Sequence, residues 1–252
     1  GWQYVFGLIA LGPFGAFLIV FLLIPALKHE KWQGPINIRL HDIFPVDKWK
    51  LVLQDKNASG FIFGYTAHTL ELFASRSWIV AFFAFCAITS GEDFFLTATT
   101  LAGIINFFGV PSSILGNEIA LRLGRQKWVC IVMLTSAVLG IAFACSTGHS
   151  WWLIVALAVG HAIFIMADSS TLTAGLVISA QENIKGAAMG LHSLMGFGGG
   201  LLGPAIFGFV LDIGGSRSSQ AAWVWAYVAV VMWGVFFVLY ERRNGWVEEA
   251  HS

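Results

Sequence analysis

Seven long apolar runs constrain what this chain can fold into more than any other feature of its sequence. Each run has about 20 residues or more, the length that an α-helix needs to cross the hydrocarbon core of a bilayer. Backbone groups in lipid must be hydrogen-bonded within the protein, and a membrane barrel would show shorter segments of alternating polarity. The sequence therefore predicts an all-α integral membrane protein whose seven transmembrane helices lie at residues 4–27, 60–89, 94–115, 128–147, 151–180, 186–211 and 221–240.

Composition supports a membrane protein and narrows the expected partners. Only 11% of the residues are charged and 57% are hydrophobic, whereas water-soluble domains carry about 25% charged residues. Lys+Arg 14 equals Asp+Glu 14, so the charge gives no reason to expect nucleic acid as a partner. We expect the partners to be the lipid bilayer and a small solute, with no cofactor and no metal. The three cysteines are an odd number and lie in apolar runs, which excludes a disulfide framework.

Basic residues lie mainly in alternate connections between the runs, and this predicts the orientation. They gather at residues 28–56, 122–127, 185 and 242–243, while the opposite connections hold only Arg217. Because cytoplasmic loops carry the excess of Lys and Arg, we expect the N-terminus outside and the C-terminus in the cytoplasm. The expected location is a cell (inner) membrane, which the chain crosses several times.

The chain is expected to divide into a single helix and a block of six helices. Residues 1–27 form the first helix, 28–59 a cytoplasmic connection, 60–240 the six-helix block and 241–252 a cytoplasmic tail. The second run is interrupted by Glu71 and Arg76, but neither piece is long enough to cross alone. One long, tilted helix is therefore expected there.

A short amphipathic helix is one interpretation of the end of the connection. Asp47 can cap it, and lysines at 48, 50 and 56 can meet anionic headgroups. Its apolar side would hold Trp49, Val52 and Leu53. The alternative is a partly ordered linker.

Three ionisable residues, Glu71, Arg76 and Asp168, lie inside the apolar runs. Each costs about 2.5–3.5 kcal/mol in hydrocarbon, so such residues persist mainly where they face a cavity or a partner. His68 lies three residues before Glu71, on the same helix face. One hypothesis is a water-accessible cavity in which Glu71 or Asp168 exchanges a proton and Arg76 or His68 engages the substrate. The alternative is a buried ion pair of Arg76 with Asp168 that only joins two helices.

Asn106 and His192 complete the candidate set for substrate binding or coupling. Each has an alternative role, like His161, as a residue that only hydrogen-bonds a neighbouring helix. Glu71 and Asp168 against Arg76 leave a formal embedded charge of −1. This charge fits a proton, a cation or a neutral solute and weakly disfavours an anion.

The sixth run is rich in glycine and contains one proline. Gly199, Gly203 and Gly208 allow close helix packing, and Pro204 removes a backbone hydrogen bond where the helix can bend. Such a helix suits a protein that moves, although static tight packing explains the same pattern.

The connection after the third run reads Gly116-Asn117-Glu118-Ile-Ala-Leu121-Arg122-Leu-Gly124-Arg125-Gln-Lys127. It resembles the cytoplasmic loop motif of the major facilitator superfamily, in which a glycine and an acid precede Arg-x-Gly-Arg. In that family the motif lies between the second and third helices of each six-helix half, as it does here. Leu121 replaces the family's usual Asp and Asn117 its usual Gly, while Glu118 can reach Arg122 one turn away.

The resemblance implies the C-terminal half of a twelve-helix transporter. Gly1-Trp2 is similar to the start of the family's sixth helix. The chain would then hold the last helix of the first bundle, the central loop and helices seven to twelve, which form one major-facilitator-type bundle. The rest of the N-terminal bundle, its first five helices, would be missing.

The function that we expect is secondary active transport of a small polar solute by alternating access, coupled to protons, and not an enzyme activity. One alternative is a seven-helix receptor or sensor, which has the same helix count. A membrane-embedded enzyme is the other, but no His-Glu-x-x-His pair or Gly-x-Ser-x-Gly elbow occurs.

Overall fold

The computed structural model describes residues 2–24, 44–91, 94–215 and 218–246. Every regular element in these ranges is an α-helix. Seven helical spans in them are long and apolar enough to cross a membrane, which confirms an all-α integral membrane protein. The chain divides into two units, residues 1–43 and 44–252, and each is described by itself.

The first unit contains one described helix, α1 (Trp2–Leu23), whose sequence is apolar apart from Gln3 near its start and also contains small residues and Pro13. No polar stripe runs along it, and a helix that is hydrophobic on all sides belongs in lipid or against other helices. The predicted connection follows α1, and its residues up to 43 lie outside the described residues, as do residues 25–27 before it.

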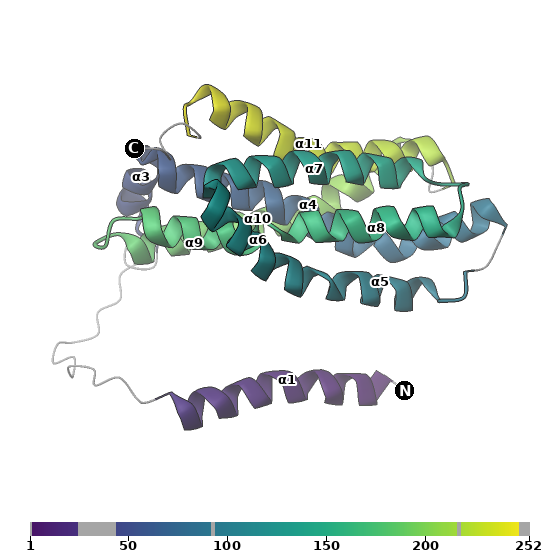
Figure 1. Ribbon diagram of the computed structural model, residues 1–252, viewed down its shortest axis with the longest axis horizontal. Helices are drawn as coiled ribbons and strands as arrows, with labels where there is room; N and C mark the ends of the chain where they lie inside the picture. The colour runs from purple at the N-terminus through teal and green to yellow at the C-terminus, as the bar shows by residue number, and fades with distance from the viewer. Residues whose placement is uncertain (1, 25–43, 92–93, 216–217, 247–252) are drawn as a thin grey trace. The chain divides into compact units, whose positions relative to one another are not determined.

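The second unit is a bundle of six spans (Figure 1). Two of the spans are broken, and a short helix precedes the bundle. The helices are α3 (Val46–Gln54), α4 (Lys56–Ser90), α5 (Ala98–Phe107), α6 (Gly109–Leu123), α7 (Arg125–Cys145), α8 (Trp151–Met166), α9 (Ser169–Ser179), α10 (Lys185–Ile213) and α11 (Gln220–Arg243).

Helix α4 is the structural centre of the bundle. Its 35 residues form one helix, about 52 Å long at 1.5 Å per residue, as the prediction of a single tilted helix requires. It begins where Oδ1 of Asp55 accepts the Ala58 N–H at 3.0 Å, and it ends at Gly91, whose φ is +66°. It packs along α10, α11 and α9.

Close approach of α10 to α4 depends on glycine. A Cβ at Gly199 would lie 2.6 Å from the carbonyl oxygen of Thr66, and one at Gly203 would overlap the carbonyl of Leu70. Thr69 adds a hydrogen bond from its hydroxyl to the Gly196 carbonyl, at 2.7 Å. These contacts show tight packing of the glycine-rich helix against α4.

The other two α10 residues singled out from the sequence, Pro204 and Gly208, both contact Trp78 of α4. The Pro204 carbonyl accepts the Trp78 indole N–H at 3.1 Å. A Cβ at Gly208 would lie 2.8 Å from the same indole ring. Proline lies inside α10 without ending it, so the helix is continuous through Pro204.

The third span is not the single helix over residues 94–115 that the sequence predicted. It consists of α5 and α6, which meet at Phe108, and α6 continues to Leu123. Pro111 explains the break, because it has no N–H for the Phe107 carbonyl and its ring crowds that carbonyl. The polar stretch after residue 115 extends the helix, because residues such as Glu118 and Arg122 are good helix formers.

The fifth span is also broken, between α8 and α9 at Ala167 and Asp168. The Ala167 carbonyl accepts the indole N–H of Trp128 in α7 at 3.1 Å. A Cβ at Gly116 of α6 would overlap the same carbonyl. An irregular backbone inside a membrane protein is tolerated where protein groups satisfy it, and here α6 and α7 enclose it.

The helix α3 confirms a short helix before the bundle, with one correction. Pro45, not Asp47, is the N-cap residue, and Asp47 lies in the first turn. Trp49 and Val52 pack against the bundle, whereas Leu53 is exposed.

Two large apolar clusters and one small cluster fill the bundle, and polar residues lie where the two large clusters meet. One cluster contains the α4 residues from Leu70 onward and is rich in aromatic rings, such as Phe82 and Trp223. The other contains the α4 residues up to Ala67. His68 and Glu71 lie where the two clusters meet, in the interior of the bundle.

Candidate functional site

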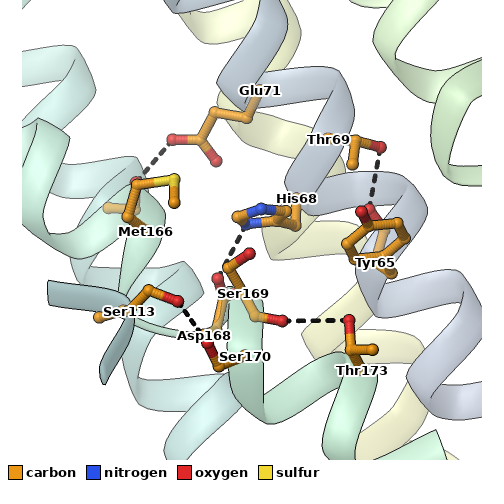
Figure 2. Close-up of polar contacts among 12 residues, drawn as sticks. Tyr65, His68, Thr69, Glu71, Ser113, Met166, Asp168, Ser169, Ser170 and Thr173 are labelled. Carbon is orange, nitrogen blue, oxygen red and sulfur yellow. Dashed lines mark hydrogen bonds and ion pairs between the residues drawn. The ribbon is translucent and has the colours of Figure 1, made fainter. Parts of the chain in front are cut away.

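Two histidine–carboxylate pairs form the centre of the candidate site. In the first, Nδ1 of His68 lies 2.8 Å from Oδ1 of Asp168 (Figure 2). Oδ1 is within ion-pair distance but accepts no well-aligned hydrogen bond from a described residue. Both side chains are buried, Asp168 with only 2% of its surface exposed.

The second pair joins Glu71 of α4 to His161 of α8. Nε2 of His161 lies 3.0 Å from Oε1 of Glu71. The hydroxyl of Ser136 in α7 donates to the same oxygen at 2.6 Å. Glu71 is 3% exposed, so a polar group from each of three spans meets inside the bundle.

The fold explains why the four residues pair in this way. His68 contacts Asp168 and Glu71 contacts His161, so residue numbers rise on α4 as they fall on the opposing span. The two spans are therefore antiparallel. His68 and Glu71 share a face of α4 because they are three residues apart, and the break before α9 places Asp168 beside His68.

The side chain of Asp168 does not cap the helix that follows it. It is the N-cap residue of α9, yet its side chain makes no cap hydrogen bond. A carboxylate at this position is normally stabilised by the N–H groups of the first helical turn. Here it lies against the imidazole of His68 instead, which indicates a role in the site.

Tyr65 connects His68 to the predicted site residue His192. The Tyr65 ring stacks on His192 with centroids 3.9 Å apart, and on His68 with centroids 5.8 Å apart. Nε2 of His192 lies 3.3 Å from the hydroxyl of Thr173 in α9. His192 therefore belongs to the surroundings of the first pair, through an aromatic neighbour.

Arg76 does not form the ion pair with Asp168 that was one of the two expectations. Asp168 is occupied by His68, and in the described part of the chain no carboxylate pairs with Arg76. Its Nη2 lies 3.6 Å from the sulfur of Met166. The side chain is exposed beside the α5–α6 break, in a groove that it shares with Asn106.

Two small cavities lie at the site. One, lined by His68, Glu71 and Asp168, has a volume of about 10 Å³ accessible to the centre of a water molecule, which is room for about one water. The other forms the floor of the Arg76 groove, has about 20 Å³ by the same measure and is also lined by His161. The Glu71–His161 pair thus connects the two cavities. The wide aqueous cavity expected around the carboxylates is not open in this conformation.

The predicted loop motif lies largely on helices. Gly116, Glu118 and Arg122 belong to α6, Gly124 is the only residue between α6 and α7, and Arg125 begins α7. Gly124 has φ +89°, a conformation that glycine adopts without strain.

Two members of this motif do not interact as expected. Glu118 and Arg122 are exposed, and the structure has no ion pair between them. Gly116 has a packing role that the motif did not predict, because it lies against Ala167 next to Asp168.

Sequence reasoning missed Ser136 and Tyr65, and it gave His161 only a secondary role. A serine or tyrosine in an apolar run gives no signal of its own, because hydroxyls there usually bond to the backbone of their own helix. His161 did carry a signal. It lies seven residues, about two turns, before Asp168, a spacing that places both on one face of a regular helix.

Comparison with models of protein families and with curated proteins finds no match to this chain. The functional argument therefore depends on the residues and their geometry.

Proposed function

We propose that this chain belongs to a proton-coupled secondary transporter that moves a small polar solute by alternating access. The observation that carries the proposal is the double histidine–carboxylate site buried among membrane-spanning helices. Ionisable residues at such depth are costly, and those that persist mark ion pathways and proton relays. The resemblance of the Arg122 region to the major facilitator superfamily agrees with this class.

The chemistry of each pair suits reversible proton binding. With the histidine neutral and the acid ionised, a pair carries one net negative charge, and one added proton makes it neutral overall. Burial penalises that net charge. Contact with water removes that penalty and allows the proton to leave. Histidine is the side chain that titrates nearest to neutral pH.

The broken spans support movement at the same place. Transporter sites commonly form where transmembrane helices are discontinuous, near the middle of the bilayer. Here the α8–α9 break supplies Asp168, and the α5–α6 break lies beside Arg76. In our proposal the closed cavities represent one state of the cycle, and a change at these breaks opens the carboxylates to water. A facing bundle would supply the opposite wall of the solute path.

Solute uptake by cells that produce the complete gene product tests this proposal. We expect accumulation of a solute that depends on an inward proton gradient. Glu71→Gln and Asp168→Asn should each abolish accumulation or uncouple it from the gradient, because an amide cannot release a proton. Glu182→Gln and Asp212→Asn are matched controls, since both acids are exposed.

Unchanged, pH-dependent accumulation by both the Glu71→Gln and the Asp168→Asn proteins would contradict the proposal. The same holds if no proton gradient drives the uptake of any solute from a broad panel.

A further inference from the structure

Arg76 has no role in the two histidine–carboxylate pairs, yet it lies deep in the longest span. It is about 30 Å from the first residue of α4 and about 20 Å from the last, at 1.5 Å per residue. Its one described polar contact is the thioether of Met166, and sulfur of this kind is a weak acceptor. An exposed guanidinium at such depth requires water or a negative partner.

The structure also changes the charge balance that the sequence suggested. By sequence alone, the charges of Glu71 and Asp168 count against that of Arg76. In the structure each acid instead pairs with a histidine. When those pairs are protonated, they are neutral overall. The groove at Arg76 then carries one uncompensated positive charge, which favours an anion where the embedded total of −1 weakly disfavoured one.

Further hydrogen-bonding groups lie at the floor of the same groove. Ser75 lines it and is 8% exposed, and its hydroxyl lies near the buried hydroxyl of Tyr227 without a well-aligned hydrogen bond within the described residues. Asn106 lines it too. One N–H of its amide is used by the Ala102 carbonyl at 2.9 Å, which leaves a second N–H. Residues with a guanidinium, a hydroxyl and an amide therefore line one small space.

The walls of the groove are apolar and include Leu72, Ile105 and Ile165. One cation balances a single negative charge, whereas a dianion would leave one charge uncompensated. The guanidinium fork matches the two oxygens of a carboxylate, and the apolar walls match an aliphatic body. The space of about 20 Å³ in the groove admits about one water, so it suits a small head group.

We propose that this groove binds the carboxylate of a small aliphatic monoanion, held by Arg76 with Ser75 and Asn106. The inference rests on the proposed function and specifies its substrate class. His161 lines the groove and bonds to Glu71, so the bound anion lies next to the proton-binding pair. Anion and proton would then move together, and their charges would cancel.

Binding of propionate to the purified full chain in lipid nanodiscs tests the inference, with saturation-transfer NMR as the measurement. Propionamide has the same body without the charge, and inorganic phosphate tests an oxyanion without the apolar body. We expect propionate to bind, and propionamide and phosphate to bind at least tenfold more weakly. Arg76→Gln should weaken propionate binding by about tenfold or more, because a hydrogen-bonded ion pair is lost.

Two further variants keep the test independent of folding defects. Asn106→Asp places a carboxylate beside Arg76 and should block propionate while Arg76 is retained. Arg243→Gln, at the exposed end of α11, should leave binding unchanged. Equal binding of propionate and propionamide, tighter binding of phosphate, no binding of any probe, or wild-type binding by Arg76→Gln would each overturn the inference.

A separate readout distinguishes failure of this inference from failure of the proposed function. Proton-driven uptake of a neutral or cationic solute that survives Arg76→Gln overturns the carboxylate site and leaves proton-coupled transport intact. Proton-driven uptake that is unchanged in both the Glu71→Gln and the Asp168→Asn proteins contradicts the transport proposal itself.

Discussion

Ser136 and His161 reach the same oxygen of Glu71. The hydroxyl of Ser136 donates to Oε1 at 2.6 Å, and Nε2 of His161 lies 3.0 Å from it. The second carboxylate oxygen of Glu71 accepts no hydrogen bond from the described residues. It is therefore the oxygen that remains for a proton, and it belongs to a residue that lines the cavity shared with His68.

Removal of the Ser136 hydroxyl should change the pH at which Glu71 releases its proton. A hydrogen bond to the ionised carboxylate stabilises that form, so Ser136→Ala favours the protonated acid. Hydrogen bonds to charged groups contribute about 1.5–3 kcal/mol. We expect the pH profile of proton-driven uptake to move toward alkaline pH.

The neighbouring hydroxyl provides the control for that shift. Thr135→Ala also removes a hydroxyl from α7, but Thr135 bonds only to the Ile131 carbonyl of its own helix. Its profile should remain that of the wild type. A Ser136→Ala profile that does not move, or that moves toward acid pH, would show that the contact does not stabilise the ionised acid.

Loss of one partner from a buried pair should destabilise the bundle more than loss of both. His68→Leu leaves Asp168 buried without its partner, and such changes cost about 3–5 kcal/mol. The double variant His68→Leu/Asp168→Leu removes both polar groups and should recover most of that stability. Thermal unfolding of the detergent-solubilised protein measures the difference. A double variant that loses as much stability as the His68→Leu and Asp168→Leu variants added together would contradict coupling.

Substitution by alanine should have opposite effects on stability at two glycines of α10. Gly203→Ala should separate α10 from α4, because the added Cβ overlaps the Leu70 carbonyl. Gly198 has no atom within 4 Å of an added Cβ, so Gly198→Ala should stabilise the helix by about 0.5–1 kcal/mol. Melting temperatures of the two variants check the pair. A Gly203→Ala protein as stable as Gly198→Ala would show that close helix contact is not required.

The sequence predicted the spans well because a helix that crosses a membrane needs a long apolar stretch, which is easily recognised. It predicted α4 as one helix through Glu71 and Arg76 for the same reason. The breaks were not predicted, although Pro111 in the third run and Asp168, a residue type preferred at helix N-caps, were signals for them.

Side-chain partners were also beyond the reach of the sequence. Helical spacing placed His68 beside Glu71 on one face, but it cannot say which residue of another helix lies opposite. The interhelix pairing of Asp168 with His68, rather than with Arg76, follows from the break before α9. Membership in the major facilitator superfamily, the orientation in the membrane and transport itself stay predictions.

Infrared difference spectroscopy of the protein in lipid, recorded while the pH is changed, tests the exchange of protons by the buried acids most directly. A protonated carboxyl group absorbs separately from a carboxylate, so each titrating acid gives a band of its own. Our account predicts carboxyl bands that change with pH, one lost in Glu71→Gln and one lost in Asp168→Asn. A spectrum in which neither substitution removes a pH-dependent carboxyl band would contradict it.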